Sequence, residues 1–308
     1  MSMLGMTTPR ALVRLQAGAA ELVLAPALGG AVVSWRRGGT ALFRPPLADA
    51  LQADSPRDLG SYPLFPYSNR VGGRRFSFAG VAYDLPDLMN GWAIHGAGWR
   101  LPWTAHPHEG GGVTLRLAYP GGALWPFAFE AEQHFDLTED GLRIGCAITN
   151  RHNGPAPLGF GLHPYFPRSP DCTLRFAASG VQMPGPDKIP VSHQAVPPAW
   201  NHEAGLPVGS VALDHCFTGW SGFARLAYPD LAYPDRGFAI DITADPVFAN
   251  AVVFVPPGQD FFAFEPVSNI TDAINRMDGP LPPGLFVIEP GAQMRGSIRF
   301  AVTPLRAE

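Results

Sequence analysis

The sequence predicts an all-β fold, a large antiparallel β-sandwich, on two observations. The first is composition, because the 308 residues include 35 glycines and 34 prolines with no repeating period, which is typical of many short strands joined by turns. The second is the alternation of apolar and polar side chains along segments in the middle of the chain, as in strands with one buried face. Hydrophobic residues make up 46% and charged residues 16%, so we expect one domain over residues 1–308, with a loosely ordered N-terminus at residues 1–15.

The first third of the chain contains four short apolar segments, which predict strands at residues 21–26, 31–35, 76–78 and 82–85. Gly29 and Gly30 separate the first two strands, and Gly80 turns the last two into a hairpin. The clearest alternation follows at residues 113–119, 127–137 and 142–148. The turn at residues 138–141 joins the last two of these segments into a long hairpin.

The second half of the chain is less regular. Residues 171–210 are rich in proline and glycine, so we expect a long loop there with one strand at residues 173–176. Residues 272–277 suggest a helical turn, with Thr271 as its N-terminal cap. Further short apolar runs predict strands at residues 237–242, 251–255, 261–265, 285–288 and 297–302.

Charge and cysteine content restrict the partners and the compartment. A net charge of −4 and a pI near 6.1 give no electrostatic basis for binding nucleic acid or an anionic membrane. The three scattered cysteines fit neither a disulfide framework nor a CxxC metal site, and no stretch has the pattern of a signal peptide or a membrane span. We therefore expect a cytoplasmic protein with a small-molecule partner; the sequence does not indicate its oligomeric state.

Several common catalytic motifs are absent from the sequence. It has no glycine-rich phosphate loop, no GxGxxG before a helix, no GxSxG and no HExxH. His106 and His108 flank a proline without a third ligand at the spacing of a zinc site. We therefore expect neither a cofactor nor a metal.

The segment at residues 159–166, GFGLHPYF, has the strongest features of a functional site. Pro164 favours an extended conformation at His163, and the neighbouring glycines permit a close approach of the backbone. His163 is therefore held at a fixed point at the end of a strand. The alternative is a histidine packed in an aromatic core.

Other polar residues lie at strand ends in aromatic surroundings, and each has a structural alternative. Glu265 follows four apolar residues and could be a surface residue that ends a strand. His95 precedes a glycine-rich turn and could satisfy backbone groups there, while Asp214 could form a turn with His215. Arg70, next to Asn69, could belong to a solvated basic cluster.

Five short segments occur in order along the chain: FPYSNRV at 65–71, IHG at 94–96, GLHPYF at 161–166, DHCF at 214–217 and FEPV at 264–267. Together they resemble the aldose 1-epimerase (galactose mutarotase-like) family over about residues 20–302. The resemblance implies a β-supersandwich and an isomerase that interconverts the α and β anomers of a free aldose without a cofactor.

By the same resemblance, Glu265 is the general base, His163 the general acid, and His95 assists at the ring oxygen. The residues implied to bind substrate are Asn69, Arg70 and Asp214, to which we add the aromatic side chains of Tyr165 and Trp99. Ring opening needs one proton removed from the C1 hydroxyl and another delivered to the ring oxygen, for which a carboxylate and an imidazole are suitable.

Some positions depart from the family pattern and leave the substrate open. Asn269 stands where many relatives have histidine, Ala292 replaces a glutamate, and Leu162 replaces an asparagine. One alternative is a hexose 6-phosphate, whose phosphate would need a cationic subsite, for which Arg74, Arg75 and Arg100 are candidates. The other is a carbohydrate-binding protein on the same fold without catalytic activity.

Overall fold

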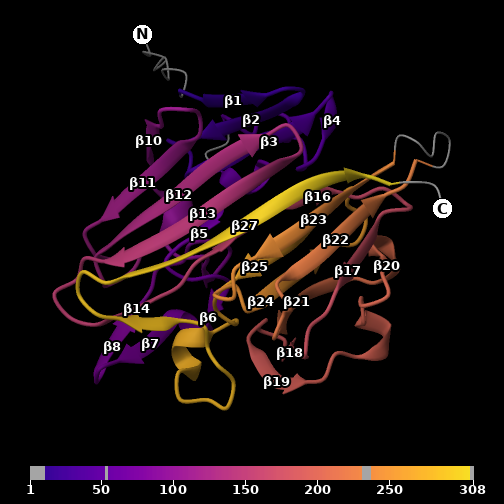
Figure 1. Cartoon of the computed structure of the whole chain (residues 1–308). Coiled ribbons are helices and arrows are strands. Elements are labelled where there is room, and N and C mark those ends of the chain that lie inside the picture. Colours follow the sequence, from indigo (N-terminus) through magenta and orange to yellow (C-terminus); the bar gives the residue numbers. More distant parts are fainter. Residues whose placement is uncertain (1–10, 53–54, 231–236, 306–308) are drawn as a thin grey trace, which may run out of the picture.

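The structure is a computed structural model that describes residues 11–52, 55–230 and 237–305. Two large antiparallel sheets dominate it, and Figure 1 shows the nine-stranded sheet in front of the eight-stranded one. The nine-stranded sheet runs, from edge to edge, through β10 (Thr104–Pro107), β11 (Val113–Tyr119), β12 (Phe129–Thr138), β13 (Gly141–Asn150), β27 (Gln293–Pro304), β23 (Phe238–Ala244), β22 (Phe223–Tyr228), β17 (Thr173–Phe176) and β20 (Leu206–Pro207).

The second sheet has seven strands in a row, and β16 (Tyr165–Pro167) pairs with β25 outside that row. The row consists of β19 (Pro190–Gln194), β18 (Gly180–Pro184), β21 (Leu213–Thr218), β24 (Asn250–Val255), β25 (Phe261–Val267), β15 (Gly161–Leu162) and β5 (Pro63–Leu64). Strands β15 and β16 are separated by only two residues and pair with the same strand, β25.

Smaller elements complete the described chain. A four-stranded sheet comprises β1 (Val13–Ala17), β2 (Ala20–Ala25), β3 (Ala31–Arg37) and β4 (Thr40–Ala41). The two-stranded sheets are β6 (Arg70–Val71) with β9 (Ala93–Ile94), β7 (Arg75–Phe78) with β8 (Val81–Asp84), and β14 (Ala156–Leu158) with β26 (Phe286–Ile288). Short 3₁₀ turns are η1 (Pro56–Asp58), η2 (Gly72–Arg74), η3 (Gly98–Arg100), η4 (Pro198–Trp200), η5 (Val208–Ser210) and η7 (Ala273–Arg276).

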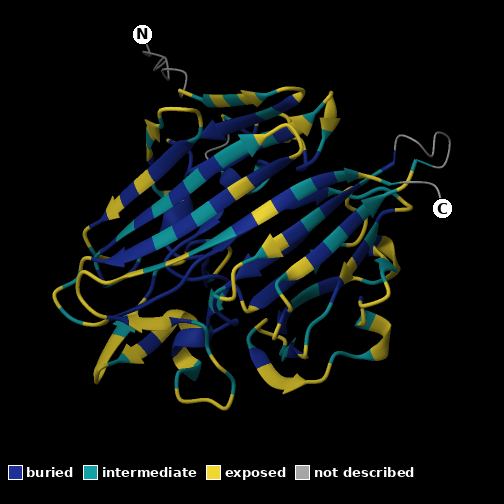
Figure 2. Ribbon diagram, viewed as in Figure 1, coloured by how far each residue is buried: buried dark blue, intermediate teal, exposed yellow. Residues whose placement is uncertain are grey.

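Aromatic side chains fill the space between the two large sheets. The ring of Phe176 on β17 lies 5.1 Å from Phe217 on β21 and 5.3 Å from Phe264 on β25, measured between centroids. Along β12, buried residues alternate with partly exposed ones, and Figure 2 shows this alternation on the nine-stranded sheet. A strand with one face on the core and one toward solvent has this pattern, so the sequence period reports which side chains form the core.

The prediction of an all-β antiparallel sandwich is confirmed, and no helix in the described residues is long and apolar enough to cross a membrane. Several details differ from the prediction, which did not include some strands of the large sheets, such as β10, β21 and β22. Residues 171–210 contain β18, β19 and β20 besides the expected strand, and Asp272 rather than Thr271 precedes η7, in a left-handed conformation without a side-chain cap. Of the predicted loose N-terminus, residues 1–10 lie outside the described residues, and β1 begins at Val13.

Candidate active site

His163 and Glu265 are in direct contact, with Nε2 of the imidazole 3.2 Å from Oε1 of the carboxyl group. The sheet register explains this contact. On one side of His163, Gly161 of β15 pairs with Val267 of β25, and on the other, Tyr165 of β16 pairs with Ala263. Residues halfway between two such pairs lie opposite one another in an antiparallel sheet, so the register sets His163 against Glu265.

The same transverse row of the sheet continues to both sides of the pair. Tyr62 lies on the other side of His163, where its carbonyl oxygen accepts a 2.9 Å hydrogen bond from the His163 N–H. Beyond Glu265, the row passes through Val252 of β24 to Cys216 of β21. Asp214 is two residues from Cys216 on the same strand and therefore lies on the same face of the sheet as Glu265.

Burial determines the protonation of the pair. His163 is 5% and Glu265 2% exposed. Removal from water lowers the pKa of His163 to about 3 and raises the pKa of Glu265 well above its ordinary value, since a low dielectric disfavours either charged form. The pair therefore favours a neutral state in which one proton lies between Nε2 and Oε1. Among the described residues, Oε2 of Glu265 has no hydrogen-bond partner.

Aromatic rings fix the orientation of the His163 imidazole. The Tyr62 ring stacks on it, with centroids 4.6 Å apart and planes 21° apart, and the Tyr165 ring lies 4.5 Å away. The Tyr62 and Tyr165 rings lie next to each other, with centroids 6.2 Å apart. Arg44 lies over the outer face of Tyr165, 4.0 Å from the ring centroid. This packing leaves the imidazole little freedom to rotate.

His95 meets His163 edge to face, with ring centroids 5.5 Å apart. It follows β9, and Asn69 precedes β6, so the antiparallel pairing of Arg70 with Ile94 places the two residues opposite each other at the same end of this small sheet. Both Asn69 and His95 have positive φ angles, and the Asn69 N–H donates to Nδ1 of His95 at 3.1 Å. Burial lowers the pKa of His95 well below its ordinary value, so the ring is neutral and its Nε2 carries the proton. His95 is therefore a hydrogen-bond donor.

Arg70 and Asp214 form the polar rim beside this group. Arg70 Nη1 donates to Oδ1 of Asn69 at 3.2 Å, and Arg70 Nη2 lies 3.8 Å from Oδ2 of Asp214. The carboxylate of Asp214 contributes to the raised pKa of Glu265, and the guanidinium of Arg70 opposes that effect. Lys188, which the sequence analysis did not single out, lies 3.7 Å from the same Asp214 oxygen.

The structure thus brings seven of the eight predicted site residues together, namely Asn69, Arg70, His95, His163, Tyr165, Asp214 and Glu265. Trp99 differs, because it is 2% exposed, packs at 5.9 Å from Tyr62 and donates to the carbonyl of Ile94. The side chains of His163 and Glu265 are in direct contact, which leaves no space for a sugar between them.

Two other expectations concern residues around this group. Of the three arginines considered for a phosphate subsite, Arg75 pairs with Asp84 and Arg100 lies over the ring of Trp99. Asn269, which stands where relatives have histidine, is buried and exchanges hydrogen bonds with the backbone of Ser68. Its role here is to hold two distant segments together.

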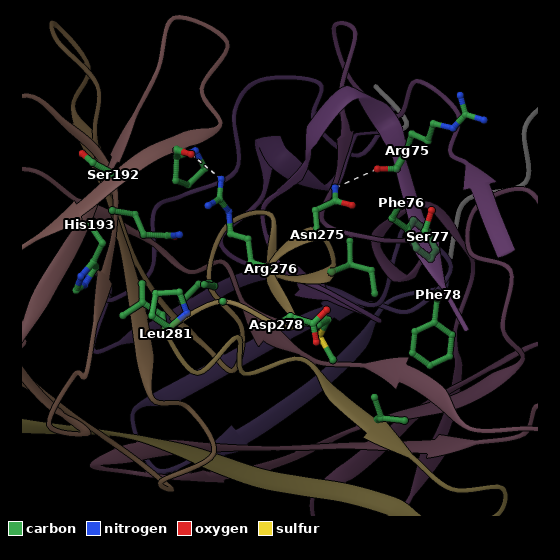
Figure 3. Close-up of a pocket in the computed structure, with 18 of the residues that line it drawn as sticks. Arg75, Phe76, Ser77, Phe78, Ser192, His193, Asn275, Arg276, Asp278 and Leu281 are labelled. Atoms are coloured by element: carbon green, nitrogen blue, oxygen red, sulfur yellow. Dashed lines mark hydrogen bonds between the residues drawn. The ribbon is translucent and has the colours of Figure 1, made fainter. Parts of the chain in front are cut away.

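A large recess of about 1280 Å³ lies between the β7 hairpin, β18–β19 and the segment around η7. Figure 3 shows Arg75, Asn275, Arg276, Asp278 and His193 around it. His163, Glu265, His95 and Asp214 are not among the residues that line it. The recess is therefore a feature separate from the His163–Glu265 pair.

Comparisons with known proteins identify similar sequences and structures. A sequence profile of the aldose 1-epimerase family matches residues 11–301. The uncharacterised protein YphB of Escherichia coli K12 is 28% identical over 284 residues, which are 89% of this chain and 93% of YphB. A crystal structure from Escherichia coli K12, provisionally described as an aldose 1-epimerase, is 27% identical with a TM-score of 0.85, over 96% of this chain and 99% of the other.

A galactose mutarotase-like protein from Clostridium acetobutylicum shares the fold at lower identity. It is 19% identical, with a TM-score of 0.81 and 95% of each chain covered. Together with the sheet order described above, this confirms the predicted antiparallel β-supersandwich of the galactose mutarotase-like type.

Proposed function

The chain belongs to the aldose 1-epimerase family, and from this premise we propose that it is an isomerase that interconverts the α and β anomers of an aldose. The observation that carries the proposal is the contact between Nε2 of His163 and Oε1 of Glu265 in a buried site. Mutarotation moves one proton away from the C1 hydroxyl and one onto the ring oxygen, so it needs two proton-transferring groups close together.

The proposed reaction starts with Glu265 ionised and His163 protonated, which is the same pair with its shared proton on Nε2. Glu265 removes the proton from the C1 hydroxyl, and His163 delivers its proton to the ring oxygen as the C1–O5 bond breaks. The open-chain aldehyde rotates about C1–C2, and the reverse transfers close the ring as the other anomer. The total number of protons and the net charge do not change, which suits a site as buried as this one.

The surrounding residues have supporting roles in this proposal. The Nε2–H of His95 donates to the ring oxygen or to the adjacent hydroxyl. Asn69, Arg70 and Asp214 bind hydroxyl groups, and the ring of Tyr165 packs against an apolar face of the sugar. Because Nε2 and Oε1 touch directly, the bound substrate must separate them to reach both.

The test is the rate of anomer exchange for α-glucose and α-galactose, followed by polarimetry or by NMR exchange. The wild-type chain should accelerate exchange, whereas Glu265→Gln and His163→Asn should each lose about 10²–10⁴-fold. Equal rates for the wild type and both variants on a broad panel of aldoses would refute the proposal. Binding of sugar without exchange would instead identify a carbohydrate-binding protein.

A further inference from the structure

Lys188 is the only lysine in the sequence. The rest of the 22 Lys and Arg residues are arginines. It lies in the turn between β18 and β19 with a φ of 59°, a conformation that costs energy for a residue with a Cβ. The turn is closed by hydrogen bonds from the Lys188 N–H to the Gly185 carbonyl and from the Gly185 N–H to Ile189. Local hydrogen bonds therefore hold Lys188 in a strained backbone position.

The turn is also tied to the strand that carries Arg70. Arg276 of η7, shown in Figure 3, donates a hydrogen bond to the carbonyl of Pro190, the first residue of β19. In the same segment, Oδ1 of Asp272 accepts from the N–H of Gly72, two residues after Arg70. One short segment therefore connects the backbone near Lys188 with the backbone near Arg70.

Lys188 and Arg70 share one carboxylate. Their side-chain nitrogens lie 3.7 and 3.8 Å from Oδ2 of Asp214, which is longer than a hydrogen bond. The Lys188 side chain is 49% exposed, whereas that of Arg70 is 16% exposed. Both cations therefore retain donors that can turn to a ligand, and Lys188 is free to approach it from solvent.

The charges around this group add up to an excess of positive charge. Lys188 and Arg70 face one carboxylate, Asp214. His163 and Glu265 together are neutral, so the pair adds no charge to this group. A neutral sugar leaves this excess unmatched, whereas a sugar with an anionic group compensates it.

We propose that Lys188 is a specificity residue that, together with Arg70, binds an anionic group of the aldose, a carboxylate or a phosphate on a carbon away from C1. This inference rests on the proposed function, because it assumes that C1 lies at the His163–Glu265 pair. Arg70 donates to Asn69, the N–H of Asn69 donates to His95, and the His95 ring lies 5.5 Å from that of His163, so one sugar can reach both the pair and the two cations.

The first test compares kcat/KM for D-glucuronate, D-glucose 6-phosphate and D-glucose in the wild type and in Lys188→Ala. Removing the ammonium should lower the preference for the anionic sugar over glucose by about 10- to 100-fold, the size of one charge-assisted hydrogen bond. The anionic sugar whose kcat/KM falls more in Lys188→Ala, D-glucuronate or D-glucose 6-phosphate, identifies the anion as carboxylate or phosphate. A matched control is Arg116→Gln, which removes a cation paired with Glu132 on the other large sheet and should keep the preference.

The second test does not depend on catalysis. N-hydroxysuccinimide acetate modifies the Lys188 amine and the N-terminal amine, the only two in the chain, and mass spectrometry of peptides separates the two products. D-glucuronate or D-glucose 6-phosphate should slow acetylation of Lys188 more than D-glucose does, and at the N-terminus all three should have no effect. Equal or absent protection by the three sugars overturns the role of Lys188, even if anomer exchange is observed. If the anionic sugars selectively protect Lys188 from acetylation but no anomer exchange is observed, the role of Lys188 is supported and the proposed reaction is refuted.

Discussion

In Glu265→Gln, the effect on catalysis can be measured apart from the effect on stability, because the contacting atoms are known to be Nε2 of His163 and Oε1 of Glu265. The amide keeps the size of the carboxyl group and can still donate to Nε2 of His163 across the 3.2 Å contact. It cannot accept a proton from the C1 hydroxyl. We therefore expect a loss of about 10²–10⁴-fold in kcat, or about 3–5 kcal/mol of activation free energy. The free energy of unfolding near pH 4 should change by less than about 1 kcal/mol.

The pH dependence of stability gives this variant a second signature. Burial raises the pKa of Glu265, so the folded state holds this proton more tightly than the unfolded chain does. The stability associated with it is fully present at pH values below the unfolded pKa, about 4.3, and is lost as pH rises toward the folded pKa, by at most about 1.4 kcal/mol per pH unit. Glutamine does not titrate, so Glu265→Gln should become more stable than wild type as pH increases from 4 to 8.

The assays are anomer exchange by NMR and urea unfolding at pH 4, 6 and 8. Glu130→Gln is a suitable control, because Glu130 is an exposed residue that pairs with Arg151 and should show neither effect. The reasoning is refuted if Glu265→Gln retains the wild-type exchange rate. It is also refuted if the stability difference between variant and wild type is the same at all three pH values.

Three further variants test the packing and protonation of the site. Tyr62→Leu removes the ring stacked on His163, whereas Tyr62→Phe keeps it. The leucine variant should therefore lower kcat roughly 2- to 10-fold more than the phenylalanine variant, as measured by steady-state kinetics of both. Burial lowers the pKa of His163 to about 3, so the contribution of His163 to stability should fall as pH falls from about 6.5 to 3, opposite in sign to the contribution of Glu265. Asparagine does not titrate, so urea unfolding should show His163→Asn gaining stability relative to wild type as pH falls through this window, by at most about 1.4 kcal/mol per pH unit. Gly96→Ala should destabilise the fold by about 2–4 kcal/mol, because its Cβ would overlap the carbonyl of Phe65 at a positive φ; Gly73→Ala, also at positive φ but in open space, should lower the thermal midpoint far less.

Regular alternation made the central strands predictable. The segment that forms β12 alternates over its whole length, and its hairpin with β13 was expected within two residues at each end. In contrast, β19 has one buried residue followed by four exposed ones, so it carries no periodic signal. Its pairing with β18 depends on the fold around it, and the sequence of residues 171–210 therefore suggested a loop.

The candidate site was predictable to the extent that its residues occur in recognisable segments. His163, Glu265 and Asp214 stand in short family-like motifs, and the structure brings them together. Tyr62 and Lys188 have no such signal, because one lies just before a two-residue strand and the other in a turn. The composition does distinguish Lys188, since it is the only lysine in the sequence.

The contact between His163 and Glu265 depends on register more than on either residue. Successive side chains of a strand point to opposite faces, so a slip of one residue between β25 and its neighbours would oppose His163 to Phe264 or to Pro266. Two pairings fix the register, Gly161 with Val267 and Tyr165 with Ala263, and both glycine and alanine are small where the strands approach. A Cβ on Gly161 would lie 2.7 Å from a methyl group of Val267. The glycine that begins the GLHPYF segment is therefore required for the strand pairing that places His163 and Glu265 together.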